Sequence, residues 1–110
     1  MQDKIVTIMV PPTAEDRQGF FTTFWQDFTI ADRFGKDAVL DTYRRAFEEW
    51  KGDYRYLTEL VMVLNHKIWE HYEKNPPLGE LYNDLWNKCA MYAEENLKGE
   101  ELSYYYEVTD

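Results

Sequence analysis

The side chains that most often carry covalent chemistry are scarce in this sequence of 110 residues, which has one serine, Ser103, and one cysteine, Cys89. A serine nucleophile needs a histidine base beside it, and a reactive cysteine needs a depressed pKa and access to solvent. Both histidines are far from Ser103 in the sequence, and Cys89 falls on the apolar stripe of a predicted helix. We therefore expect Cys89 to be buried and inert, and the chain to be no enzyme.

Metal ligation is the second chemistry to consider. His66 and His71 are five residues apart, which places them roughly 140° apart around a helix. His66, Glu70 and Glu73 do share one helix face, but the Glu-x-x-His spacing of di-iron bundles is absent and no second helix offers a matching pair. No glycine-rich phosphate loop occurs either. The expectation is a salt-bridged surface, with no metal and no cofactor.

Charge narrows the choice of partner. Acids outnumber bases by 21 to 12, for a net charge of −9. Such a chain is poorly suited to bind nucleic acid directly or to bind an anionic membrane surface, because both need a cationic face. A basic protein surface is the partner that this charge favours.

The acids gather near the C-terminus, where three consecutive tyrosines also lie. This region is either a solvated face that keeps the protein soluble or an acidic, aromatic docking patch, which would fit a basic partner or imitate a nucleic-acid backbone. At least one tyrosine must face outward; in the plainer interpretation two pack on the helices and the third is ordinary surface. The predicted partner-binding residues are Glu94, Glu95, Glu100, Glu101, Tyr104, Tyr105, Tyr106 and Glu107.

Four amphipathic stretches of the sequence must position the candidate functional side chains described above. Apolar residues at helical spacing predict helices over about residues 20–34, 36–51, 54–74 and 78–97. The third is apolar on more than one side, so we place it at the centre, with Tyr72 on its buried stripe. Each helix carries one tryptophan, for which a place in the core is expected, although Trp25 has no obvious apolar face to join. Met62 and Met91 are expected to fill the core.

The two ends are less regular. Residues 1–12 contain a β-branched run before Pro11 and are predicted to form a short strand or an extended arm. The tail over residues 100–110 fits either a helix or a strand at 104–108 that pairs with residues 4–10. The predicted fold is mainly α: one antiparallel four-helix bundle-like domain over residues 13–110, with an acidic C-terminal tail. A single cysteine and no secretory signal favour the cytoplasm.

Three stretches resemble small open reading frames of phages and mobile elements of gut bacteria: FWQDFTIADRFG (24–35), YLTELVMVLNHKIWEHYE (56–73) and LYNDLWNKCAMYAEENLKGEELSYYYEVTD (81–110). Those reading frames have no assigned activity, so the resemblance carries over no functional residue. It implies a mobile-element context, in which small acidic proteins often inhibit host defence machinery.

Three functional hypotheses follow. The first is a non-catalytic protein-binding module, in its sharpest form an inhibitor of a basic, nucleic-acid-handling host protein. The second is a structural module that associates with itself as a homodimer through surplus aromatic surface. The third is a small-molecule binder with a cavity between helices near His66 and Tyr72.

Overall fold

A computed structural model describes the chain over residues 14–109, with side chains described from residue 19 onward. The described part is mainly helical and contains no strand. Its helices are α2 (Ala14–Asp32), α3 (Lys36–Trp50), α4 (Tyr54–His71), α5 (Pro76–Asn96) and α6 (Gly99–Thr109). The strand or arm predicted for residues 1–12 lies outside the described residues.

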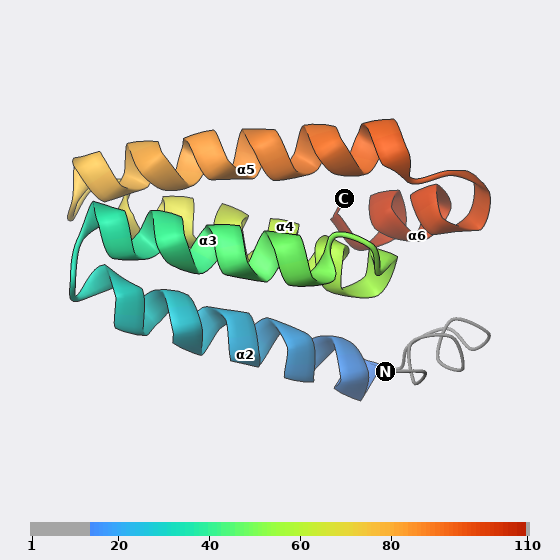
Figure 1. The fold of residues 1–110 in the computed structure, drawn as a ribbon, viewed down its shortest axis with the longest axis horizontal. Helices are drawn as coiled ribbons and strands as arrows, with labels where there is room; N and C mark the ends of the chain where they lie inside the picture. Colours follow the sequence, from blue (N-terminus) through green and yellow to red (C-terminus); the bar gives the residue numbers. More distant parts are fainter. Residues whose placement is uncertain (1–13, 110) are drawn as a thin grey trace.

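Consecutive helices run in opposite directions along the long axis of the molecule (Figure 1). In this view α2, α3 and α5 lie one above another, α4 runs behind α3, and the short α6 folds back at one end. Helix α4 packs against each of the other four described helices. The prediction that the most apolar helix lies at the centre is therefore confirmed, because a helix with apolar residues around its circumference is stable only between neighbours.

Local signals explain where the helices begin. The Asp53 carboxylate accepts a hydrogen bond from the backbone N–H of Arg55 at 3.0 Å, which caps α4. Asn75 precedes α5, and Pro76 occupies the first helical position, where its missing N–H costs nothing. Gly35, in the turn before α3, and Gly99, the first residue of α6, adopt positive φ angles of 106° and 57°, which let the chain reverse at these points.

The core contains most of the predicted apolar stripes. Its fully or nearly fully buried members include Phe24, Phe28, Val39, Leu57, Leu60, Leu64, Tyr82, Leu85 and Cys89. The prediction that Cys89 is buried is confirmed, and burial raises the pKa of its thiol to about 12.

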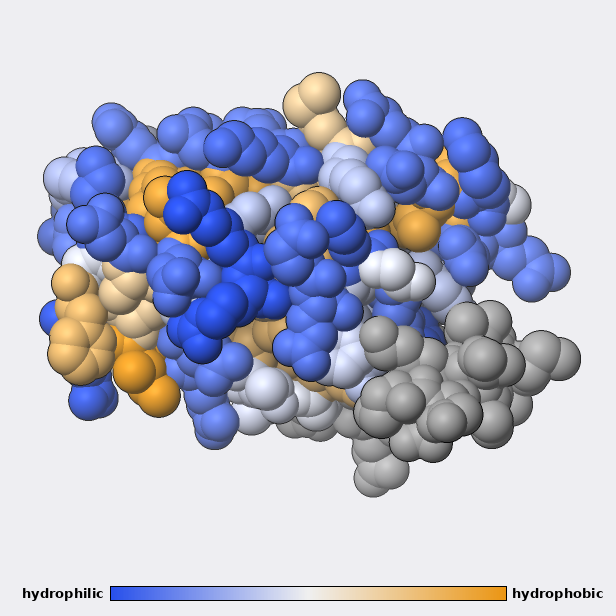
Figure 2. Space-filling model, in the orientation of Figure 1, coloured by the Kyte–Doolittle hydropathy of each residue, from blue (hydrophilic) through white to orange (hydrophobic). Residues whose placement is uncertain are grey.

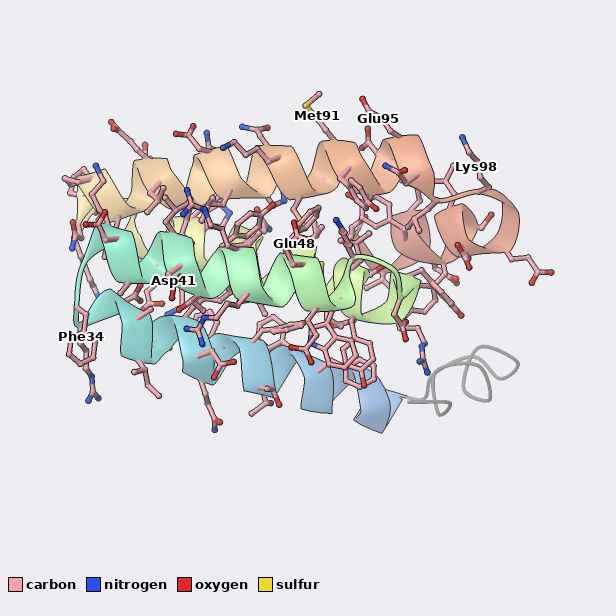
Figure 3. All side chains as sticks on the ribbon, viewed as in Figure 1. Phe34, Asp41, Glu48, Met91, Glu95 and Lys98 are labelled. Carbon is pink, nitrogen blue, oxygen red and sulfur yellow. The ribbon has the colours of Figure 1, made fainter. Side chains whose placement is uncertain are left out.

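Three predicted core residues are exposed instead. The exposed fraction is 67% for Trp69, 62% for Tyr72 and 59% for Met91. Met91 points away from the molecule on the outer side of α5 (Figure 3). The expected core roles of these residues are wrong, because no described helix covers the faces on which they lie: Trp69 is near the end of α4, Tyr72 directly follows it, and Met91 is on the outer side of α5.

The tail is a helix. Residues Gly99–Thr109 form α6, which packs on α4 and α5 through buried Tyr105 and through Tyr104, whose ring meets Tyr54 edge-on with centroids 5.2 Å apart. The alternative of a strand at 104–108 is therefore wrong. Tyr106 is exposed, so two tyrosines pack and one faces outward.

Among the described residues, no helix is both long enough and apolar enough to cross a lipid bilayer.

Candidate functional site

A cluster of charged side chains lies where the ends of α2 and α4 meet α5. At its centre is Asp32, the last residue of α2. Its Oδ2 atom lies 2.9 Å from Lys67 Nζ and 2.8 Å from His71 Nε2, and its Oδ1 atom accepts a hydrogen bond from the Tyr82 hydroxyl at 2.5 Å. Because an ionised carboxylate only accepts, the Nε2 atom of His71 carries the proton in this contact.

Lys67 is the cation of the cluster, and its side chain is completely buried. Its ammonium group donates to Thr29 Oγ1, Asp32 Oδ2 and Glu70 Oε1, each at 2.9 Å. It also lies 4.2 Å from the centre of the Trp25 ring. All three N–H donors are therefore satisfied, and the face of the indole covers the remaining side.

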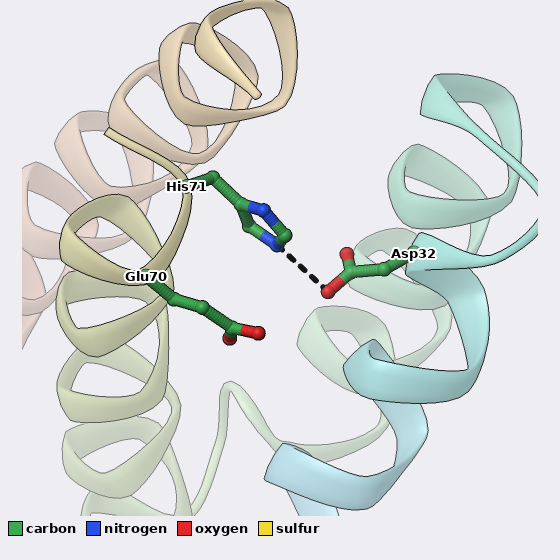
Figure 4. Close-up of side chains that lie close together, drawn as sticks. All are labelled: Asp32, Glu70 and His71. Carbon is green, nitrogen blue, oxygen red and sulfur yellow. Dashed lines mark hydrogen bonds and ion pairs between the residues drawn. The ribbon is translucent and has the colours of Figure 1, made fainter. Parts of the chain in front are cut away.

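Asp32, Glu70 and His71 each offer a ligand atom, and these atoms lie within 4.8 Å of one another (Figure 4). The spacing suits a metal ion, and Asp32 is the partner from a second helix that the sequence argument did not find. However, the ammonium of Lys67 already bridges the two carboxylates. A divalent ion beside it would face strong repulsion in a buried setting. The cluster is better described as an internal ion-pair network.

The network joins three helices; Lys67 and Tyr82 are completely buried, whereas Glu70 is exposed at its edge. Tyr82 is fully buried, and its ring stacks on the His71 ring with an interplanar angle of 3°. Burial and the hydrogen bond to Asp32 raise the pKa of the Tyr82 hydroxyl above its usual range. Of the helix face formed by His66, Glu70 and Glu73, which was expected to be a salt-bridged surface, only Glu70 joins the network; His66 is exposed and meets the Phe21 ring edge-on.

A groove of about 670 Å³ lies between α4 and α5 at this end of the molecule. Its lining includes three aromatic residues, Trp69, Tyr72 and Trp86. The Trp69 and Tyr72 rings lie 5.7 Å apart, centre to centre, and both are largely exposed. Glu80 and Asp84, one helical turn apart on α5, supply its charge.

The groove lies only partly where the sequence predicted a cavity, near His66 and Tyr72. Tyr72 borders it as expected, but His66 does not. None of its lining residues is a lysine or an arginine. A groove with exposed aromatic rings and unopposed carboxylates is suited to a partner that brings apolar area and positive charge together.

The acidic residues predicted to bind a partner lie at the opposite end of α5 and on α6. Glu94, Glu95, Glu100 and Glu107 are exposed, and Glu101 is half-buried. Glu95 and Lys98 project outward at this end (Figure 3). Glu94 follows Asp84 by 10 positions on the same helix, so the nearest carboxylates of the two acidic regions on α5 are roughly 15 Å apart along the axis.

A second groove, of about 490 Å³, lies between α2 and α3. Ile30 and Phe34 border it, and Phe34 is 76% exposed. Hydrophobic side chains are visible on the surface beside the α2–α3 turn, at the lower left of Figure 2, whereas most of the α3 face is hydrophilic.

Comparison of the chain with protein-family models, with curated proteins and with solved structures finds no match.

Proposed function

We propose that this chain is a non-catalytic module that binds a basic protein partner through the groove between α4 and α5, with the four long helices acting as an antiparallel bundle that holds the groove in shape. The observation that carries the proposal is the exposure of Trp69 and Tyr72 beside each other at the rim of this groove. Tryptophan and tyrosine are the residues most often found to dominate binding energy at interfaces.

The acidic end formed by α5 and α6 has a different role in this proposal. Along α5, Glu94 and Glu95 lie roughly 15 Å from Asp84, the nearer carboxylate of the groove, a distance close to two Debye lengths at physiological salt, where the Debye length is about 8 Å. The exposed carboxylates of this acidic end therefore speed the approach of a basic partner, whereas the groove determines how long the complex lasts. A nucleic-acid-handling protein, whose surface is basic, is one partner that fits this charge.

The test is capture from an extract of the organism that makes the protein, with three immobilised forms compared. Wild type and Met91→Ala, which removes an exposed side chain on the outer side of α5, should retain the same basic protein. The Trp69→Ala/Tyr72→Ala double variant should retain it at least about tenfold less, as expected when interface hot spots are truncated. Equal retention of that protein by all three forms would refute the groove as the binding site.

A second candidate, self-association, is favoured by one observation. Phe34 and Ile30 are exposed beside the groove between α2 and α3, and a twofold dimer would let each Phe34 enter the groove of the other copy. Sedimentation of wild type and Phe34→Asp separates the cases: a dimer that the substitution dissociates supports self-association, and a wild-type monomer at high micromolar concentration rejects it.

A further inference from the structure

Within this protein, cations are held in a recurring way, by an aromatic ring together with a carboxylate. The buried example is Lys67, whose ammonium lies over the Trp25 ring at 4.2 Å and bonds to Asp32 at 2.9 Å. The ring attracts the cation through its quadrupole, and the carboxylate neutralises its charge.

Two further cations repeat the arrangement, Lys51 near the surface and Arg55 in a second buried position. Lys51 lies 5.6 Å from the centre of the Phe47 ring and pairs with Glu48 at 3.0 Å. Arg55 lies 5.8 Å from the centre of the Tyr56 ring and pairs with Asp53 at 2.8 Å. The combination is thus used for both lysine and arginine, and for both buried and exposed groups.

The groove between α4 and α5 presents the same two components. Trp69 and Tyr72 supply ring faces, and Glu80 and Asp84 supply carboxylates from the facing helix. Neither carboxylate forms an ion pair with any residue in the described part of the chain, and no cationic side chain borders the groove. The cation is the one component of the arrangement that the groove itself does not supply.

We infer that the groove receives an arginine side chain of the partner, with the guanidinium packed on Trp69 and Tyr72 and paired with Glu80 and Asp84. This inference rests on the proposed function and specifies the chemistry of its site. Arginine fits better than lysine because its planar guanidinium stacks on rings, bonds to carboxylates through two N–H groups, and is less strongly hydrated in a half-open groove.

The test uses a capped five-residue peptide with arginine at its centre and alanine elsewhere. Binding is followed through the indole N–H signals of the four tryptophans by nuclear magnetic resonance, with the Trp69 signal identified from its loss in Trp69→Phe. We expect a saturable shift of the Trp69 signal. The same peptide with citrulline, which keeps the shape but not the charge, should bind about tenfold more weakly, and the lysine peptide should also bind more weakly.

A matched pair of variants separates a specific site from general attraction to an acidic protein. Glu80→Gln/Asp84→Asn and Glu94→Gln/Glu95→Gln each remove two negative charges, but only the first pair borders the groove. The first should weaken arginine-peptide binding by about fivefold or more and the second by less than about twofold, because screening limits the range of exposed charges.

Several results would overturn the inference: equal weakening by the two variants, equal binding of the citrulline peptide, or lysine binding as tightly as arginine. Its failure is distinguishable from failure of the proposed function. If a basic protein is retained through Trp69 and Tyr72 while the arginine peptide does not bind, the groove is a docking site that does not recognise arginine. If neither binds, both proposals fail.

Discussion

Lys67 is a residue whose environment would be unfavourable without each of its partners. A fully buried ammonium has lost its water, and three oxygen acceptors and one indole ring replace that water. The sequence does contain a signal for this burial. Lys67 and His71 continue the spacing of Leu60 and Leu64, at i, i+4, i+7 and i+11, so the two polar residues lie on the buried stripe of α4. Spacing alone could not identify Asp32 as their partner, because that contact joins residues 35 and 39 positions apart.

Replacing Lys67 with methionine should therefore destabilise the fold strongly. The substitution keeps the length of the side chain but leaves the Asp32 carboxylate without its main counter-charge, a change that costs about 3–5 kcal/mol for a buried ion pair. Urea unfolding followed by circular dichroism measures the loss. Lys88→Met, at an exposed position on α5, is the control and should change stability by less than about 0.5 kcal/mol. A loss below about 1 kcal/mol for Lys67→Met would contradict the role of the network.

At the scale of elements, helical periodicity predicted the four long helices well because glycine and proline separate them clearly. Helix α2 begins at Ala14, where Thr13 and the two acids after Ala14 indicate a helix start, ahead of the apolar stripe that begins near Phe20. The main difference is the end of α4 at His71 rather than near Lys74. The exposure of Trp69 and Tyr72 was not predictable, because hydrophobicity indicates which residues favour burial but not which helix face has a neighbour to cover it. The sequence of the tail did not distinguish a strand from a helix, because tyrosine occurs in both. Packing of the tail against α4 favours the helix.

Tyr105 should be the residue that holds α6 in place. It is the buried residue of that helix, and truncating a buried aromatic side chain costs about 3–5 kcal/mol. In Tyr105→Ala, backbone amides of α6 should exchange with solvent deuterium at least about tenfold faster, because local opening then costs less. Ser103→Ala, which alters an exposed position of the same helix, should leave exchange unchanged. If α6 amides are equally protected in the wild type and in Tyr105→Ala, then other contacts secure the tail.

For the whole molecule, the buried tyrosine hydroxyls and the Cys89 thiol determine how the free energy of unfolding changes at alkaline pH. Burial raises the pKa of Tyr105 from 10.0 to about 12 and that of Cys89 from 9.0 to about 12, and it also raises the pKa values of Tyr43 and Tyr82. These groups lose their protons more easily in the unfolded chain than in the folded one. The free energy of unfolding is therefore unaffected by these groups below their pKa values in the unfolded chain. It falls as the pH rises from about 9 through about 12.

The urea midpoint should accordingly decline between about pH 9 and pH 11. Tyr105→Phe removes one of the phenols responsible, so its midpoint should decline less steeply over the same range. Ultraviolet absorbance of tyrosinate gives an independent check, since the buried phenols should ionise together with unfolding. A midpoint that stays constant up to pH 11 would show that these groups ionise as easily in the folded protein as in the unfolded chain.

The net charge of the whole molecule should affect how fast it associates with a basic partner. Charge reversal by Glu100→Lys/Glu101→Lys should slow association with a basic partner and make it less sensitive to salt, while the dissociation rate changes little, because these carboxylates are remote from the groove. Stopped-flow or surface-based kinetics with the captured partner measures both rates. A change confined to dissociation would place α6 within the interface.

The most direct test of the docking groove is site-specific photo-cross-linking in living cells of the organism that makes the protein. A photoreactive amino acid is placed at position 69 in one strain and at position 91 in another, since both positions are exposed on the described surface but only the first borders the groove. The proposal predicts a covalent adduct with one basic protein from position 69 and none with that protein from position 91. Adducts with the same protein from both positions, or from position 91 alone, would contradict it.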